Sequence, residues 1–317
     1  MRRHFVHFLW GSLLAILGLV FVFFISVWNG WVGYMPNMDE LSNPIDKFAS
    51  QVYSSDQQLI GTWNADNNNR VAIDYNGLSP HLVHALVATE DERFYEHSGI
   101  DFIALGRAVV KRGVMGQASA GGGSTITQQL AKQLFSEKAH STVERLLQKP
   151  IEWIIAVKLE RYFTKEEILA MYFNYFDFLH NAVGIKRAAN VYFNKEPRKL
   201  TVTESAMLVG LCKNPSMFNP LRHPERCLQR RNVVLMQMVK SGYVTKDEYK
   251  ELSQRPLGLH FTRSKPVSGA GDYFQAFLRQ YMMAKKPERE NYQSWQNRPF
   301  VLDSIAWEQD PLFGWFH

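Results

Sequence analysis

A chain of 317 residues is long enough to bury a substantial core and allows one or two domains. Its formal net charge of +6 favours an acidic partner such as a phosphate group or an anionic membrane, but nucleic acid is disfavoured because no basic cluster interleaved with aromatic residues occurs. Two cysteines, Cys212 and Cys227, are too few for a disulfide framework and lack metal-ligand spacing, so we expect two buried thiols or one bridge between them.

The first predicted element is a membrane-spanning helix. No Asp, Glu, Lys or Arg occurs from Phe5 to Met38, and Phe8 to Val27 is nearly all apolar. A helix needs about 20 apolar residues to cross a bilayer. A cleaved signal peptide would have a shorter apolar core and a small-residue cleavage site, which the chain lacks. Residues 1–35 are therefore predicted to be a single-pass anchor, with the N-terminus in the cytoplasm and the rest outside.

Residues 36–255 are predicted to form a mainly α domain with a small β portion. Short apolar runs between residues 51 and 75, the last of them Val71 to Ile73, predict the β portion. From Ser79 to about residue 253 the apolar spacing is helical. A hydroxyl residue followed three positions later by Glu predicts a capped helix start. Four such pairs occur, which are Ser141 with Glu144, Thr164 with Glu167, Thr201 with Glu204, and Thr245 with Glu248.

Residues 256–317 are predicted to be a linker or tail. Prolines and glycines break the pattern, and a short helix is predicted over residues 273–285. The end is rich in aromatic residues, namely Trp307, Phe313, Trp315 and Phe316. So many aromatic residues in a short tail suggest packing against something outside this chain.

The main candidate for a catalytic residue is Glu90. Apolar residues at Leu82, Ala85 and Leu86 predict a half-buried helix that ends at Glu90 and Asp91. A carboxylate at the edge of an apolar wall can serve as a general base. On spacing alone, a solvated acidic helix end is the simpler interpretation.

A glycine-rich segment, Gly121 to Gly123, leads into Ser124 and the helix that follows. Backbone amides are free at such a helix start, and the helix dipole favours an anion there. Lys132 lies within two turns and could neutralise a phosphate. The segment is not a P-loop, because the Gly-Lys-Ser/Thr order is absent, and a flexible linker is the alternative.

Two further helix starts are predicted. Pro150 suits the first turn of a new helix because it lacks an amide hydrogen, and Glu152 would then lie where the dipole stabilises a negative charge. Asp101 is a predicted N-cap for a helix through Met115, with Arg107 on its polar face. An ordinary amphipathic surface helix is the alternative for that segment.

These stretches resemble the signatures of the peptidoglycan glycosyltransferases, glycosyltransferase family 51, which form the chain-polymerising half of class A penicillin-binding proteins. The first signature, Glu-Asp-x-x-Phe-x-x-His-x-Gly-x-Asp, is matched by Glu90, Asp91, Phe94, His97, Gly99 and Asp101. The second, Gly-Gly-Ser-Thr-Ile-Thr-Gln-Gln-Leu-x-Lys-Asn, is matched from residue 122 to Lys132, with Gln133 in place of Asn. The third, Arg-Lys-x-x-Glu, retains Lys149 and Glu152 but has Gln148 in place of the arginine, unless Arg145 supplies that arginine's contact.

The fourth signature, Phe-Gly-x-Gly-x-Tyr-Gly-Ile, is only partly retained. Leu179 and Asn181 replace two glycines, and Val183 replaces the tyrosine. This loss suggests a subfamily variant. Residues 200–220 resemble the fifth signature, so all five follow in order between about residues 50 and 250.

The resemblance implies a lysozyme-like, mainly α fold that polymerises lipid II into glycan strands at the outer face of the cytoplasmic membrane, releasing undecaprenyl diphosphate with inversion. It implies Glu90 as general base, and Glu152 with a divalent cation, Mg²⁺ or Mn²⁺, as stabiliser of the diphosphate. The substrate-binding residues that it implies are Asp91, Phe94, His97, Arg107, Ser124, Thr125, Thr127, Gln128, Gln129, Lys132 and Lys149. The implied partners are lipid II, the growing lipid-linked glycan, the membrane and other cell-wall synthesis proteins.

Two alternatives remain at this point. A lysozyme-like hydrolase would use its glutamate as an acid, but glycan cleavage has no diphosphate for the lysines to hold. An inactive membrane-tethered scaffold is supported only by the altered fourth signature and is opposed by the retained Glu90 and Glu152. No Ser-x-x-Lys nucleophile motif occurs, so transpeptidation is not expected of this chain. The aromatic tail predicts a linker toward a transpeptidase domain beyond His317.

Overall fold

The computed structural model describes residues 2–31, 34–36, 41, 50–53, 59–63, 71–110, 123–136, 141–262, 277 and 280–314. The predictions for Met115, for Gly121, for most of the helix at 273–285, and for Trp315 and Phe316 lie outside these residues. The backbone divides into two compact units. One comprises Met1–Asp46 and Arg70–Arg263, and the other comprises Lys47–Asn69 and Ser264–His317.

The first unit begins with the apolar helix α1, Arg2–Trp28. Within it, Val6–Trp28 has a mean hydropathy of 2.6 and, among the described residues, is the one segment long and apolar enough to cross a membrane. The predicted N-terminal apolar helix is therefore confirmed, and its orientation stays a prediction. The end of α1 packs on α6, Thr142–Tyr162, where the ring of Phe24 lies parallel to that of Trp153 at 6.4 Å.

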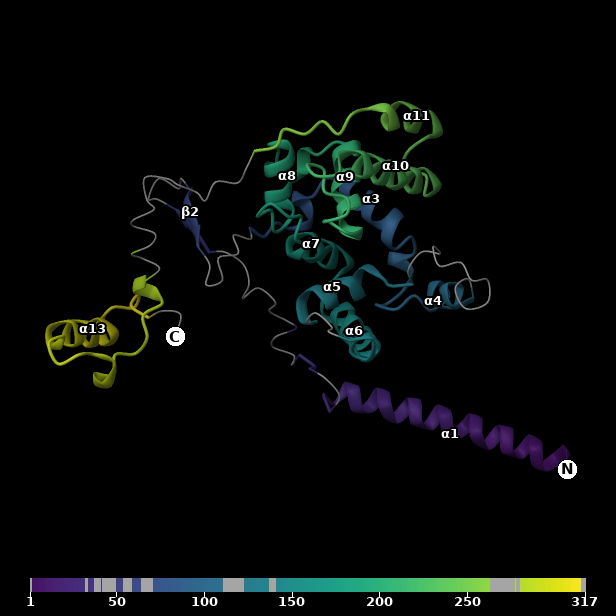
Figure 1. Cartoon of the computed structure of the whole chain (residues 1–317), viewed down its shortest axis with the longest axis horizontal. Helices are drawn as coiled ribbons and strands as arrows, with labels where there is room; N and C mark the ends of the chain where they lie inside the picture. Colours follow the sequence, from purple (N-terminus) through teal and green to yellow (C-terminus); the bar gives the residue numbers. More distant parts are fainter. Residues whose placement is uncertain are drawn as a thin grey trace. The chain divides into compact units, whose positions relative to one another are not determined.

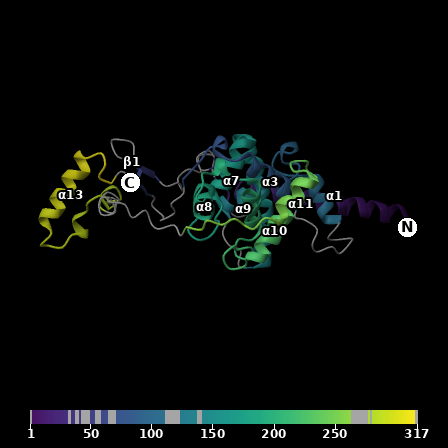
Figure 2. The same ribbon diagram turned by 90° about the horizontal axis from the view of Figure 1, so that it is seen from above.

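The rest of this unit is helical, as predicted (Figure 1). Its other elements are η2 (Tyr75–Gly77), α3 (Pro80–Glu90), η3 (Phe94–Glu96), α4 (Phe102–Val109), α5 (Ile126–Phe135), α7 (Lys165–Tyr175), α8 (Ile185–Phe193), η5 (Pro197–Lys199), α9 (Val202–Lys213), α10 (Pro224–Lys240) and α11 (Lys246–Gln254). Helices α3, α9 and α10 pack on one another (Figures 1 and 2), and α5 packs on α6 and α7 (Figure 1). Because α9 is buried at every position from Glu204 to Cys212, it is the central helix of the core.

The predicted capping signals are largely present. Three form complete capping boxes, at Thr164, Thr201 and Thr245. Ser141 accepts a hydrogen bond from the amide of Glu144, which is one half of such a box. Side-chain caps satisfy amides that have no partner within the helix, so these helices begin where the sequence predicts.

The predicted helix start at Pro150 is wrong. Helix α6 runs without a break through Pro150, so Glu152 lies in the middle of the helix and not in its first turn. The proline removes one backbone hydrogen bond. The apolar face of α6, with Ile155 and Leu159 fully buried, outweighs that loss.

The β portion is smaller than predicted. The segment from Val71 to Ile73 is not a strand, because the backbone of Ile73 pairs with the side-chain amide of Asn174, at 2.8 and 3.2 Å. The two strands, β1 (Ser50–Tyr53) and β2 (Leu59–Trp63), form an antiparallel pair that belongs to the second unit.

The second unit also holds η6 (Arg289–Asn291) and α13 (Asn297–Gln309). Part of its aromatic content packs internally, since the Phe313 ring contacts those of Tyr281 and Trp307 at 4.8 and 6.4 Å. Trp307 and Phe313 therefore have aromatic partners within the chain, and packing of the tail against something outside it stays a prediction.

Candidate active site

A cavity of about 690 Å³ in the helical unit brings many of the predicted residues together. Its walls come from the end of α3, from α5, α6, α9 and α10, and from the residue after α7. The described residues that line it are Thr89, Glu90, Ser124, Gln128, Gln129, Lys132, Gln133, Arg145, Lys149, Glu152, Phe176, Cys212, Lys213, Arg230, Val233 and Gln237. Sequence positions far apart, from residue 89 to residue 237, thus meet in one place.

The lining is strongly cationic. Two carboxylates, Glu90 and Glu152, face five basic side chains, which are those of Lys132, Arg145, Lys149, Lys213 and Arg230. A partly enclosed cavity with this balance of charge attracts an anion and holds it more strongly than open water would. The cavity therefore suits a ligand that carries several negative charges.

Glu90 is the last residue of α3, and its side chain is only 16% exposed. The buried apolar residues of α3, such as Leu82 and Leu86, fix the helix in the core and so present Glu90 at the cavity. The Gln129 amide donates a hydrogen bond to Glu90 Oε2 at 3.0 Å, and Arg230 Nη2 lies 3.4 Å from Oε1. Both oxygens therefore have a neighbouring donor, and these two contacts orient the carboxylate at the cavity, as a general base requires.

A second charged group forms around Glu152, which has no exposed area. Lys149 Nζ donates to Glu152 Oε2 at 2.6 Å and to Ser124 Oγ at 3.3 Å. Glu152 Oε1 is buried and has no hydrogen-bond partner among the residues that the structure describes. Burial, and then the charges of Arg145 and Lys149, lower the pKa of the nearby Lys132, whereas Glu152 opposes this effect. An anion bound here would relieve the repulsion among these like charges.

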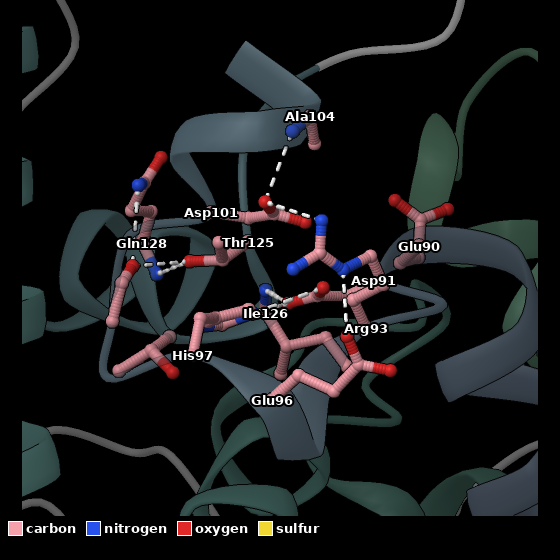
Figure 3. A network of polar contacts seen from close by, with 12 residues as sticks. Glu90, Asp91, Arg93, Glu96, His97, Asp101, Ala104, Thr125, Ile126 and Gln128 are labelled. Carbon is pink, nitrogen blue, oxygen red and sulfur yellow. Dashed lines mark hydrogen bonds and ion pairs between the residues drawn. The ribbon is translucent and has the colours of Figure 1, made fainter. Parts of the chain in front are cut away.

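Asp91 and its neighbours in the first signature form a buried polar network beside the cavity (Figure 3). Asp91 accepts hydrogen bonds from the backbone amide of Ile126 at 3.0 Å and from His97 Nε2 at 3.0 Å. A carboxylate at the first residue of α5 satisfies a free amide and complements the helix dipole. Figure 3 draws no contact between Glu90 and this network.

The same network ties the first signature to the second. Thr125 caps α5 by accepting from the amide of Gln128, and its hydroxyl donates to the carbonyl of Gly99 at 2.7 Å. The Gln128 side chain also donates to that carbonyl, at 3.2 Å. Asp101 caps α4, as predicted, by accepting from the amides of Ile103 and Ala104. These contacts fix the starts of α4 and α5 relative to Glu90.

Gly99 is the one position in this network where a side chain cannot be placed. Its φ of +93° is unfavourable for other residues, and a Cβ atom would lie 2.8 Å from the carbonyl carbon of Ala156 in α6. Glycine therefore allows the first signature to pack directly against the helix that carries Glu152.

The remaining predicted residues lie outside the cavity lining. Thr127 is fully buried and donates to Glu160, and Phe94 is fully buried beneath Lys165 Nζ, 4.2 Å from its ring centre. Arg107 is exposed on α4. The six predicted substrate-binding residues that do not line the cavity are Asp91, Phe94, His97, Arg107, Thr125 and Thr127. Direct substrate contact by these six stays a prediction.

Arg230 is the main cavity residue that the sequence does not identify. It is followed by Arg231, which is fully buried and donates to the carbonyl groups of Ser253 and Pro256 at the end of α11. Arg231 therefore packs in the core, and Arg230 lines the cavity. Adjacent identical residues on one helix give no sequence signal that tells these roles apart. Cys212 is also a lining residue, and both cysteines are free thiols.

A metal ion held by the protein alone does not fit the part of the chain that the structure describes. That part contains no group of three His, Cys, Asp or Glu side chains able to hold one. Glu152, the predicted ligand, already gives one oxygen to Lys149, with Lys132 and Arg145 lining the same cavity. Protein-bound Mg²⁺ generally needs substrate phosphates beside its carboxylates. Binding of a divalent cation stays a prediction, and the proposed reaction contains no step that uses one.

Comparison with known proteins agrees with these features. The family model described as Transglycosylase matches residues 56–239. Penicillin-binding protein 1A of Aquifex aeolicus is 37% identical over 279 residues, which cover 87% of this chain and 37% of that protein. Penicillin-binding protein 1A of Escherichia coli is 35% identical over 78% of this chain and 28% of its own length.

Two further relatives extend the comparison. Penicillin-binding protein 1F of Bacillus subtilis is 39% identical over 67% of this chain and 29% of its own length. The crystal structure of penicillin-binding protein 1A from Haemophilus influenzae is 23% identical, covers 78% of this chain and 26% of that chain, and has a TM-score of 0.38. The chain matches between 28% and 37% of the length of the three curated relatives.

Proposed function

The chain belongs to the transglycosylase family, and from this premise we propose that it polymerises peptidoglycan glycan strands from lipid II, as the chain-polymerising part of a class A penicillin-binding protein. The observation that supports this most is the composition of the cavity. A partly buried carboxylate, Glu90, shares it with five basic side chains. A base and an anion site in one cavity are what transfer from a diphosphate donor requires.

In the proposed reaction, the 4-hydroxyl oxygen of the lipid II acceptor attacks the anomeric carbon of the growing chain. The new bond is the glycosidic C–O bond, and the bond that breaks joins the anomeric carbon to the diphosphate oxygen. Glu90 takes the proton of the attacking hydroxyl, which makes that oxygen a better nucleophile. Attack from the face opposite the leaving group inverts the anomeric centre.

The leaving group is undecaprenyl diphosphate, which departs with the electron pair of the broken bond. It needs positive charge more than a proton, because a diphosphate is stable as an anion. Lys132, Arg145 and Lys149 are the proposed counter-charges, and Ser124 and Glu152 hold Lys149. Such preorganised charge stabilises the transition state without reorganising at the moment of reaction.

The proposed setting is the outer face of the cytoplasmic membrane. The apolar helix α1 suits a single-pass anchor, and lipid II is itself held in the membrane by its polyprenyl chain. The anchored enzyme and the anchored lipid II would then meet by diffusion in the plane of the membrane. Other cell-wall synthesis proteins are proposed partners.

Lipid II turnover by the purified chain tests this function. We expect long glycan strands on a gel, with one undecaprenyl diphosphate released for each bond formed. Preformed glycan strands, incubated in parallel, should keep their length. Shortening of those strands without polymer formation from lipid II would contradict the proposal and favour a hydrolase.

A further inference from the structure

The carboxylate of Glu90 accepts a hydrogen bond from the side-chain amide of Gln129, and the other end of that amide contacts Tyr172. Gln129 Nε2 donates to Glu90 Oε2 at 3.0 Å, and Gln129 Oε1 accepts from the hydroxyl group of Tyr172 at 3.1 Å. An ionised carboxylate can only accept hydrogen bonds, so the amide must turn its NH₂ group toward Glu90. The amide oxygen then faces Tyr172, which must donate to it.

Tyr172 is well suited to be a permanent donor. It is fully buried on α7, with the rings of Phe173 and Phe176 centred 5.7 and 6.1 Å from its own. Burial, and then the nearby Cys212 and Glu90, raise the pKa of Tyr172 well above its ordinary value. The hydroxyl group therefore keeps its proton throughout the neutral range.

We propose that Tyr172 is a positioning residue for Glu90, acting through Gln129 to hold the carboxylate in one orientation at the cavity wall. This inference rests on the proposed function, in which Glu90 is the general base. Tyr172 is not among the residues that line the cavity, so it acts without touching the substrate.

The groups around Glu90 define what the loss of this hydroxyl would do. Gln129 faces it from α5, Arg230 from α10, Cys212 from α9 and Tyr172 from α7. Without the hydroxyl, the Gln129 amide can rotate and present its oxygen to Glu90. A carboxylate oxygen and an amide oxygen are both acceptors and cannot hydrogen-bond, so Glu90 would lose the contact that fixes its orientation.

The test is Tyr172→Phe, assayed for lipid II polymerisation. We expect kcat to fall by on the order of tenfold, the effect of one hydrogen bond in a buried site. KM should stay within about twofold of wild type, because the cavity lining is unchanged.

Tyr192→Phe is the matched control. Tyr192 is also fully buried, and its hydroxyl donates to the carbonyl of Phe178 at 2.6 Å, away from Gln129. This variant should lose thermal stability much as Tyr172→Phe does, yet keep the wild-type kcat. A double-mutant cycle adds a second readout, because Tyr172→Phe should have little further effect in a Gln129→Met background.

An unchanged kcat in Tyr172→Phe would overturn the proposal, as would the same fall in kcat in Tyr192→Phe. Wild-type protein in the same assay separates the two levels of failure. If wild type polymerises lipid II and Tyr172→Phe behaves like it, only the positioning role is wrong. If wild type makes no polymer, the proposed function is wrong and the positioning role fails with it.

Discussion

Glu90 and Asp91 are adjacent in the sequence, yet their carboxylates meet different surroundings. The Glu90 side chain opens onto the cavity, where Gln129 and Arg230 approach it. The Asp91 side chain turns toward the start of α5, where it accepts from Ile126. The end of α3 separates them, because Glu90 is its last residue and Asp91 has left helical geometry. One residue is thus available for chemistry, and the other fixes the helix that supplies Gln129.

Arg145 is a candidate substitute for the arginine that the third signature has at the position of Gln148. Arg145 lines the cavity, one turn of α6 before Gln148, the position where the third signature has arginine. We expect Arg145→Gln to lower the polymerisation rate by about 10- to 100-fold, the effect of losing one charged contact to a phosphate. Adding Gln148→Arg to this variant should restore part of the rate, because residues three apart share a helix face.

The rate of lipid II consumption measures this pair of changes. Gln148→Arg alone is the control, and it should stay near the wild-type rate. A wild-type rate in Arg145→Gln would remove Arg145 from the anion site.

At the scale of elements, the connection between α7 and α8 has a left-handed backbone although two glycines of the fourth signature are replaced. Leu179, His180 and Asn181 all have positive φ, at 66°, 53° and 60°. Asp177 accepts from the amide of Leu179 at 2.8 Å, and the amide of Ala182 donates to the carbonyl of Leu179 at 2.8 Å. These hydrogen bonds hold a left-handed turn at the two positions where the fourth signature has glycine.

Substitutions at Asn181 test that account, because this residue is exposed and few packing effects interfere. Asparagine tolerates the left-handed region better than alanine does, and glycine adopts it most readily. We expect Asn181→Ala to lower the free energy of unfolding by about 1 kcal/mol. Asn181→Gly should leave it unchanged or slightly higher, as measured by chemical unfolding in detergent. Equal stability of the two variants would show that the turn imposes no left-handed strain.

What the sequence predicts correctly in these elements is local. The capping boxes at Thr164, Thr201 and Thr245 depend on residues three apart, and each begins a helix as expected. What it mispredicts depends on tertiary contacts. Pro150 does not start a helix, because the buried face of α6 carries the helix through it. In the site, Arg230 lines the cavity whereas Arg231 is buried in the core. The difference arises because the two residues lie on different sides of α10.

At the scale of the whole molecule, the apolar helix α1 and the cavity both contact α6. Phe24 of α1 stacks on Trp153, the residue that follows Glu152, and Lys158 Nζ lies 4.9 Å from the ring centre of Trp28. Helix α6, which carries the proposed counter-charges Arg145 and Lys149, therefore also contacts α1. The position of the cavity relative to the bilayer would depend on this contact.

Penicillin binding gives a prediction about the whole chain. The curated relatives are named penicillin-binding proteins, but this chain matches about a third of their length and contains no Ser-x-x-Lys motif. A covalent penicilloyl adduct needs that serine nucleophile. We expect labelled penicillin to leave this polypeptide unmarked on a denaturing gel, with a full-length class A penicillin-binding protein labelled in the same tube as control. A labelled band at 36.7 kDa would contradict this.

The most direct test of the account is the polymerisation rate of Glu90→Gln with lipid II. This change removes the proton acceptor with little change in volume, so folding and lipid II binding should persist. We expect the rate to fall by at least about 10²-fold, on the order of 3 kcal/mol in the activation barrier. Glu96→Gln, an exposed residue paired with Arg93 outside the cavity, should keep the wild-type rate. A Glu90→Gln rate within about tenfold of wild type would contradict the assignment of Glu90 as the base.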